Sequence, residues 1–289
     1  MNSIKREAFA KINLGLDVLR RRPDGYHEVR MIMQTICLHD EIWMEKTEEN
    51  GIWVETNLEG LPVNEDNLVY KAAKLLMDEF SVTQGLKINL QKRIPVAAGM
   101  AGGSADAAAV LEGVNELFGL GLSKEELMKR GVSIGADVPY CIMRGTALAE
   151  GIGEVLTPLP SIPACQILIA KPPIDVSTKF VYTNLKANEL ESHPDIDGQI
   201  AAIRSGDLAG MCRTMGNVLE TVTVPAYPVI GEIRDVMLSY GAVNAMMSGS
   251  GPTVFGIFEK KEDAEAAAKA VQAMDAAMQV HVTEALSQA

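Results

Sequence analysis

The chain has 289 residues, of which 47% are hydrophobic and 22% are charged, and its formal net charge is −12. This composition is typical of a globular protein with one large domain or two of ordinary size. The negative net charge argues against a general affinity for nucleic acid or anionic membranes, because binding to either requires a basic surface.

The cysteines do not indicate a metal site or a disulfide framework. They are far apart and none forms a C-x-x-C pair, so we expect reduced thiols that pack as small buried hydrophobes; they are Cys37, Cys141, Cys165 and Cys212. No run of apolar residues is long enough to span a membrane, and residues 1–16 lack the pattern of a signal peptide. A cytoplasmic location is therefore expected.

Residues 7–19 alternate with a period of two, which predicts a β-strand. One face of this strand is apolar. The other face carries Phe9, Lys11, Asn13, Gly15 and Asp17. A turn follows at Pro23–Gly25, and further strands are expected at 31–46 and 51–57, so the first sixty residues should be rich in β-structure.

Helices and strands are mixed along the rest of the chain. Helices are expected at 64–80, 102–118, 123–134, 176–186, 196–220, 228–240 and 261–274. Strands are expected at 85–94, 165–171, 243–249, 251–258 and 279–285. Residues 135–140 should form a loop, and three prolines between 157 and 163 predict a crossover between two halves. This irregular order favours an α+β fold over a doubly wound sheet.

A stretch of small residues, PVAAGMAGGS at 95–104, lies between a predicted strand and a predicted helix. Glycines let backbone N–H groups approach a ligand closely, and the first N–H groups of a helix have no partner within it. The arrangement therefore indicates a phosphate-binding loop. It fits neither the Walker pattern nor G-x-G-x-x-G. Tight helix–sheet packing through small residues is the alternative.

Three segments in order along the chain resemble the motifs of the GHMP kinases: AKINLGL at 10–16, PVAAGMAGGSA at 95–105 and SGSGPTV at 248–254. The segments PDGYHEV at 23–29 and GADVPY at 135–140 resemble, within that family, kinases of a diphosphocytidyl sugar alcohol in isoprenoid precursor synthesis. The resemblance implies an ATP-dependent phosphotransferase with an alcohol as acceptor, and ATP with Mg²⁺ as cofactors.

The resemblance also implies a two-domain α+β architecture. It comprises an S5-like, ATP-binding and catalytic domain at 1–156 and an α/β sandwich at 157–289 that contributes to substrate binding, with the site in the cleft between them. The loop departs from its commonest form at Ala101, Ala105 and Asp106. We expect Ser104 to make the hydroxyl contact that Ala105 lacks, and Asp106 to point away from phosphate.

By resemblance, Asp137 accepts the proton of the attacking hydroxyl, and Lys11 is the charge partner that keeps Asp137 ionised. The residues alone leave open a turn or cap role for Asp137 and a solvated strand position for Lys11. ATP binding is assigned to Asn67, for which helix capping is the alternative, and to Pro95, Val96, Ala97, Ala98, Gly99, Met100, Ala101, Gly102, Gly103, Ser104 and Ala105. No protein ligand of a metal is identified with certainty; Ser104 is a candidate.

Substrate binding is assigned to Asn13, Tyr26, His27, Lys171, Thr178, Tyr182, Ser248 and Gly249. The rings of Tyr26 and His27 suit a cytosine, while Lys171 and the hydroxyls of Ser177 and Thr178 suit a diphosphate. Tyr182 is expected to supply a second ring. Its rival is Phe180, whose helical spacing favours a core position. Asp17 is either a further site residue or a surface residue at a strand end.

Two other functions remain open. The acceptor of the phosphoryl group could be another alcohol, such as homoserine or a mevalonate-like acid. The chain could also be a non-catalytic nucleotide-binding or RNA-binding module, since a related fold occurs in translation proteins, but its acidic composition argues against this. The expected partners are a small-molecule substrate, with no nucleic acid and no membrane, in a monomer or weak homodimer.

Overall fold

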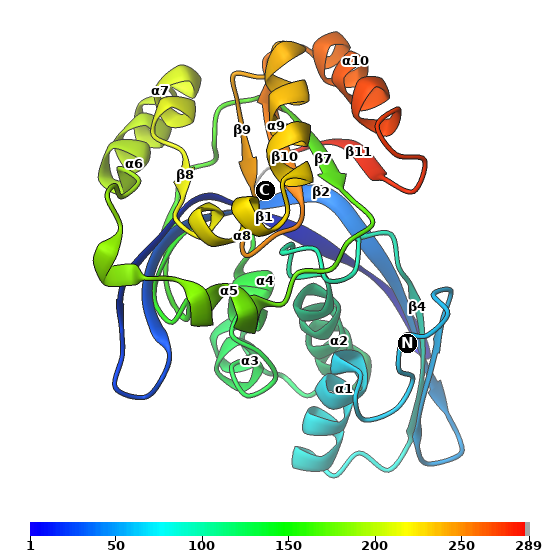
Figure 1. Cartoon of the computed structure of the whole chain (residues 1–289). Helices are drawn as coiled ribbons and strands as arrows, with labels where there is room; N and C mark the ends of the chain where they lie inside the picture. Colours follow the sequence, from blue (N-terminus) through cyan, green and yellow to red (C-terminus); the bar gives the residue numbers. More distant parts are fainter. Residues whose placement is uncertain (287–289) are drawn as a thin grey trace. The chain divides into compact units, whose positions relative to one another are not determined.

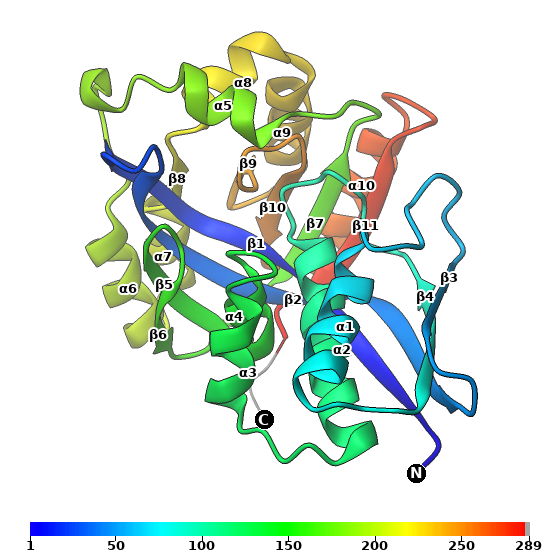
Figure 2. The ribbon, with the colours of Figure 1, turned by 90° about the horizontal axis from the view of Figure 1, so that it is seen from below.

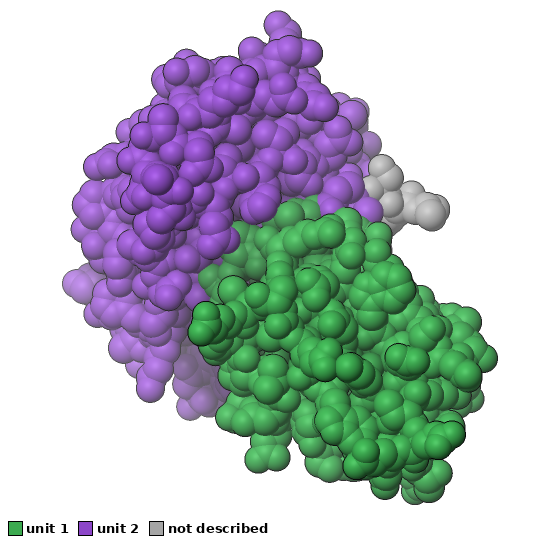
Figure 3. All heavy atoms as spheres, turned by 90° about the vertical axis from the view of Figure 1, so that its right-hand side faces the viewer, with its two compact units in different colours: residues 1–10, 38–96, 101–143 green, residues 11–37, 97–100, 144–289 purple. Residues whose placement is uncertain are grey.

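The computed structural model describes residues 1–286, which form two compact units (Figures 1 and 3). Unit 1 comprises residues 1–10, 38–96 and 101–143, and unit 2 comprises residues 11–37, 97–100 and the described residues from Arg144 onward. Strands β1 (Ser3–Arg21) and β2 (His27–Thr47) contribute to both units. The predicted α+β content is confirmed, whereas the predicted domain boundary after residue 156 stays a prediction.

Unit 1 combines one part of a seven-stranded sheet with a group of helices. In the sheet, β4 (Gly85–Gln91) pairs antiparallel with residues 41–47 of β2 and parallel with β3 (Ile52–Thr56). Helix α2 (Gly102–Phe118) contacts each of the other three helices (Figure 2). These are α1 (Leu68–Glu79), α3 (Lys124–Gly131) and α4 (Val138–Met143). The buried alanines of α2 allow this close packing on several sides.

Unit 2 contains the other part of this seven-stranded sheet and the whole of a second sheet. The first has the order β8-β1-β2-β5-β6, with β5 (Thr146–Gly151), β6 (Val155–Leu159) and the short β8 (Gly216–Asn217). The second is antiparallel, in the order β11-β7-β10-β9. Its strands are β7 (Gln166–Lys171), β9 (Asn244–Met247), β10 (Val254–Phe258) and β11 (Gln279–Glu284).

Helices α9 (Val229–Ser239) and α10 (Lys261–Gln272) pack on the second sheet, in which every residue of β10 is buried (Figure 1). The other elements of unit 2 are α5 (Thr178–Asn184), the 3₁₀ turn Ala187–Glu189, α6 (Ile196–Ser205), α7 (Leu208–Arg213) and α8 (Glu220–Ala226). Within residues 1–286, no helix is long and apolar enough to cross a membrane.

Both faces of β1 are buried over residues 11–18, in unit 2. The predicted polar face is as inaccessible as the apolar one, since Asn13 is 1% exposed. Helix α6 covers part of it: Gln199 Nε2 donates to the carbonyl oxygen of Leu14 at 2.8 Å, and a Cβ on Gly15 would lie 2.4 Å from Gln199 Oε1. A glycine is therefore required where the helix approaches the strand.

The single helix predicted at 196–220 is wrong. Gly206 takes the left-handed conformation (φ 72°) and ends α6, and the side chain of Asp207 accepts a hydrogen bond from the N–H of Gly210 and caps α7. A glycine in the left-handed conformation commonly ends a helix, and an aspartate N-cap commonly begins the next one. The chain then forms β8 and α8, neither of which was predicted.

Two further predictions for the middle of the chain are wrong in part of their range. Residues 138–140 are not a loop but begin α4, where Pro139 is tolerated because a first-turn residue needs no N–H partner. The crossover predicted at 157–163 begins inside β6, which pairs with β5 in an unpredicted hairpin. Pro158 fits there because β6 lies at the edge of its sheet.

The cysteine prediction holds for three of four residues. Cys141, Cys165 and Cys212 are buried, as expected, but Cys37 is exposed. Cys37 lies on β2 beside the isolated bridge between Ile36 and Ala285, and its Sγ contacts the carbonyl oxygen of Ala285 at 3.8 Å. Burial raises the pKa values of the Cys165 and Cys212 thiols to about 12, so both stay protonated.

Candidate active site

The small-residue loop before α2 is accessible and has an unusual backbone. Val96 is 44% exposed, and Ala97, Gly99 and Ala101 have φ values of 51°, 67° and 55°. The left-handed conformation costs an alanine about 1 kcal/mol, so the surrounding structure must hold the loop in this shape. Helix α2 begins at Gly102 without a side-chain cap. Its first N–H groups, with the loop amides, suit an anion.

The SGSGPTV segment meets this loop at Gly99. Ser248 Oγ donates to the Gly99 carbonyl oxygen at 3.1 Å. A Cβ on Gly99 would lie 2.3 Å from the Ser248 carbonyl oxygen, and a Cβ on Gly249 would lie 3.1 Å from the Gly99 carbonyl oxygen. Both glycines are thus required by the close approach of two backbones, which brings together segments 149 residues apart in the sequence.

The ammonium of Lys11 contacts the same carbonyl. Lys11 is 5% exposed, and its Nζ donates to the Gly99 carbonyl oxygen at 3.0 Å and to Asn13 Oδ1 at 2.7 Å. Its backbone N–H donates to the Met100 carbonyl oxygen. A solvated strand position for Lys11 is therefore excluded. Because an ammonium has three donors, one N–H remains after these two side-chain contacts.

Asp137 is half-buried and immediately precedes α4, and its carbonyl oxygen accepts the N–H of Cys141 at 3.0 Å. In the same unit, Ser104 lies in the first turn of α2, and its Oγ would be 3.6 Å from a Cβ on Gly135. The hydroxyl therefore neighbours the segment that carries Asp137. Within residues 1–286, no group of three His, Cys, Asp or Glu side chains could hold a metal ion.

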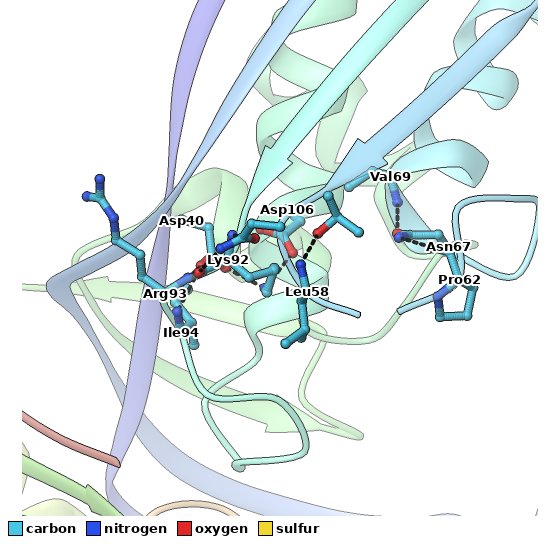
Figure 4. A network of polar contacts seen from close by, with 11 residues as sticks. Asp40, Leu58, Pro62, Asn67, Val69, Lys92, Arg93, Ile94 and Asp106 are labelled. Atoms are coloured by element: carbon cyan, nitrogen blue, oxygen red, sulfur yellow. Dashed lines mark hydrogen bonds and ion pairs between the residues drawn. The ribbon is translucent and has the colours of Figure 1, made fainter. Parts of the chain in front are cut away.

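Asn67 caps α1. Its Oδ1 accepts the N–H of Val69 at 3.0 Å, and its Nδ2 donates to the Pro62 carbonyl oxygen at 2.7 Å (Figure 4). The capping alternative is thus observed. A role of Asn67 in ATP binding stays a prediction.

The rings of His27 and Tyr182 lie together, with centroids 5.2 Å apart and planes at 42°. Burial, assisted by the charge of Arg21, lowers the pKa of His27, so its imidazole is neutral at pH 7 and can both donate and accept. Tyr26 is 61% exposed. The core position favoured for Phe180 is wrong: it is 41% exposed, because the short α5 buries Val181 instead.

The remaining polar candidates have partners of their own. Lys171 is buried, and its Nζ contacts the carbonyl oxygens of Pro172 and Ile174 and the carboxylate of Asp175. The side chain of Ser177 accepts a hydrogen bond from a backbone N–H and caps α5. Thr178 Oγ1 lies 2.9 Å from Ser250 Oγ, which joins α5 to the SGSGPTV segment. Contact of these residues with a substrate stays a prediction.

Asp17 is not a surface residue at a strand end. It is 5% exposed, and its Oδ1 lies 2.7 Å from Nδ1 of His193. His193 precedes α6 and approaches β1 from a distant part of the sequence, which no local pattern of β1 indicated.

Sequence reasoning also missed Asn217. This buried side chain donates to the carbonyl oxygens of Met247 and Gly249 at 2.9 and 2.8 Å and accepts the N–H of Leu219 at 3.0 Å. It therefore fixes the glycine turn that meets Gly99. No sequence pattern around this isolated asparagine indicates the role, which becomes evident only from its hydrogen-bond partners in the fold.

Comparison with known proteins identifies the family. Residues 67–145 match the model described as "GHMP kinases N terminal domain", and residues 199–277 match "GHMP kinases C terminal". The chain is 57% identical to "4-diphosphocytidyl-2-C-methyl-D-erythritol kinase" of Lachnospira eligens, over 98% of the chain and 99% of that relative. It is 59% identical to the protein with the same name in Lachnoclostridium phytofermentans, over 92% of each.

Solved structures agree with this assignment. The structure described as "Crystal structure of 4-(cytidine 5'-diphospho)-2C-methyl-D-erythritol kinase" matches with a TM-score of 0.85 and 31% identity, over 99% of this chain and 100% of that one. A homoserine kinase from Cytophaga hutchinsonii shares the fold at a TM-score of 0.81 and 22% identity, over 99% and 95% of the two chains. With relatives this similar along nearly its whole length, the chain belongs to the GHMP kinases and is an ATP-dependent phosphotransferase.

Proposed function

We propose that this chain phosphorylates the 2-hydroxyl of 4-diphosphocytidyl-2-C-methyl-D-erythritol with ATP, giving the 2-phosphate and ADP. The reaction would serve the methylerythritol phosphate route to isoprenoid precursors in the cytoplasm. The observation that carries the proposal is the name shared by the relatives at 57% and 59% identity. Homoserine and mevalonate are the rival acceptors, and their kinases are similar to this chain in fold at 22% identity or less.

In the proposed chemistry, Asp137 takes the proton from the acceptor hydroxyl and Lys11 is its charge partner. The burial of Lys11 supports this role, because a buried ammonium requires a compensating negative charge. Its contacts with Asn13 and Gly99 leave one N–H for a carboxylate. Such an ammonium would keep the base ionised and favour deprotonation of the hydroxyl.

The triphosphate of ATP is proposed to lie on the loop before α2, with Ser104 contributing its hydroxyl. The left-handed backbone of the loop and the uncapped start of α2 support this, since both leave N–H groups for phosphate oxygens. Mg²⁺ would accompany ATP and neutralise charge between its phosphates. Ser104 is the candidate protein ligand, with phosphate and water oxygens filling the other positions.

The cytosine of the acceptor is proposed to bind at Tyr26, His27 and Tyr182. The pair formed by His27 and Tyr182 supports this, because it offers an aromatic face beside a neutral donor–acceptor ring. Of the two candidates for the second ring, the contact with His27 favours Tyr182 over Phe180.

Replacement of Asp137 tests the assignment of the base. Asp137→Asn should lower kcat by about 100-fold or more, because loss of a general base typically costs that much. ATP affinity, measured by isothermal titration calorimetry, should stay near that of the native protein. The control is Asp78→Asn, which changes an exposed carboxylate of α1. If Asp137→Asn turns over at a near-normal rate, Asp137 is not the base.

A further inference from the structure

A buried cluster of three ionisable residues lies in unit 1 next to the phosphate loop (Figure 4). Lys92, Asp40 and Asp106 form it, and we call it the Lys92 clip. The Lys92 side chain is 6% exposed; its Nζ donates to Asp106 Oδ2 at 2.7 Å and forms an ion pair with Asp40. The side chains of Asp40 and Asp106 are 0% and 4% exposed.

The clip ties together the two ends of the loop. Lys92 directly follows β4, and Asp40 accepts the backbone N–H groups of Arg93 and, at 2.8 Å, of Ile94. Asp106 lies in α2, just after the loop. A Cβ on Gly102 would be 3.3 Å from Lys92 Nζ, so the ammonium lies beside the first residue of α2.

Such a cluster is a costly way to stabilise a core. Two carboxyl groups and one ammonium are withdrawn from water, so their attraction is offset by desolvation and, where both carboxyls are ionised, by repulsion between them. Apolar side chains of similar size would often stabilise the fold as well or better. Instead, the clip fixes the end of β4 relative to α2 through short, charge-assisted hydrogen bonds.

We propose that the Lys92 clip positions the phosphate loop for ATP, with Asp106 as the positioning residue that links Lys92 to α2. The inference rests on the proposed function, in which this loop binds the triphosphate. Residues 95–101 include two alanines in the left-handed conformation, a shape that the surroundings must impose. With both ends fixed, the loop amides keep their directions before the nucleotide arrives, and less binding free energy is spent on ordering them.

Two substitutions of Asp106 separate positioning from folding. Asp106→Leu removes the link to α2 but leaves Lys92 and Asp40 as a one-to-one ion pair, so no buried charge loses its only partner. Asp106→Asn keeps an oxygen for Lys92, and its amide nitrogen replaces Oδ1, which has no hydrogen-bond partner among the described residues. The asparagine variant should therefore retain the clip.

The measurements are KM for ATP, KM for the alcohol acceptor, kcat and the thermal midpoint of each purified variant. Asp106→Leu should raise KM for ATP about tenfold and leave the acceptor's KM within about twofold, since misplaced binding groups weaken one ligand selectively. Asp106→Asn should keep both constants near those of the native protein. If the leucine variant does not fold, Asp106→Ala takes its place.

Gly103→Val places a side chain on the loop itself. It distinguishes failure of the positioning role of the clip from failure of the proposed ATP site. If Gly103→Val raises KM for ATP and Asp106→Leu does not, the positioning role is overturned and the proposed function stands. The positioning role is also overturned if Asp106→Leu raises both KM values equally, or if the asparagine and leucine variants behave alike. If Gly103→Val leaves KM for ATP unchanged, the loop is not the ATP site and both proposals fail.

Discussion

Asp106 is a carboxyl group whose surroundings disfavour its ionised form. Burial raises its pKa to about 8, and the nearby Asp40 acts in the same direction, while Lys92 opposes both. In an unfolded chain the pKa of an aspartate is about 3.9. The folded protein therefore binds more protons than the unfolded chain between these pH values. Stability falls as pH rises through this window, and the full penalty is reached above pH 8.

Asp106→Asn should remove this pH dependence. Relative to the native protein, the variant should gain stability between pH 6 and pH 8, by up to about 1.4 kcal/mol per pH unit. Thermal midpoints measured across this range provide the test. The exposed Asp78→Asn variant should keep a constant difference from the native protein. A constant difference for Asp106→Asn as well would mean that Asp106 titrates with an ordinary pKa.

At the level of single residues, a motif predicts which side chains share a face but not what covers them. The alternation of β1 placed Lys11 and Asn13 on one face, and the structure joins them by a 2.7 Å hydrogen bond. The alternation could not reveal what covers that face, since Gly99 is 88 residues away from Lys11 in the sequence. For the same reason the alternation does not decide the role of Asp17, since its partner His193 comes from a segment without a recognisable motif.

At the scale of elements, the glycine turn between β9 and β10 depends on Asn217. Asn217→Ala should lower the free energy of unfolding by about 2–4 kcal/mol, because two buried carbonyl oxygens and one N–H lose their partner. Asn217→Asp should be at least as harmful, since a carboxylate accepts but cannot donate to the carbonyls.

Thermal unfolding measures both Asn217 variants. Asn184→Ala is the matched control, because Asn184 is exposed and makes a single hydrogen bond to the Phe180 carbonyl oxygen. That variant should unfold within about 0.5 kcal/mol of the native protein. Equal midpoints for Asn217→Ala and Asn184→Ala would contradict the role assigned to Asn217.

The elements with a clear period were predictable, and those set by single interruptions or by tertiary contacts were not. The alternation at 7–19 and the small residues at 102–118 correspond to β1 and α2. The predicted helix at 196–220 failed at Gly206, because hydrophobic periodicity continues across a glycine that ends a helix. The hairpin at 146–159 was hidden by Pro158, which only an edge strand accommodates.

At the scale of the whole molecule, an acidic chain must bind an anionic nucleotide. With a net charge of −12, the protein repels polyphosphates at long range. Backbone N–H groups at the loop and at the start of α2 offer local positive potential without changing that net charge. The phosphate loop could be predicted from the sequence because it consists of consecutive small residues. The clip that holds it depends on three residues far apart in the sequence, Asp40, Lys92 and Asp106, and was not predicted.

The proposed function depends on the identity of the acceptor, and a coupled assay of ADP release distinguishes the three candidate alcohols. The purified protein, with ATP and Mg²⁺, is given 4-diphosphocytidyl-2-C-methyl-D-erythritol, homoserine or mevalonate in parallel, with Asp137→Asn as the inactive reference. We expect rapid ADP release with the diphosphocytidyl compound and, with the other two alcohols, rates no higher than that of the reference. Faster release with homoserine or mevalonate, or no release with any of the three, would contradict the account.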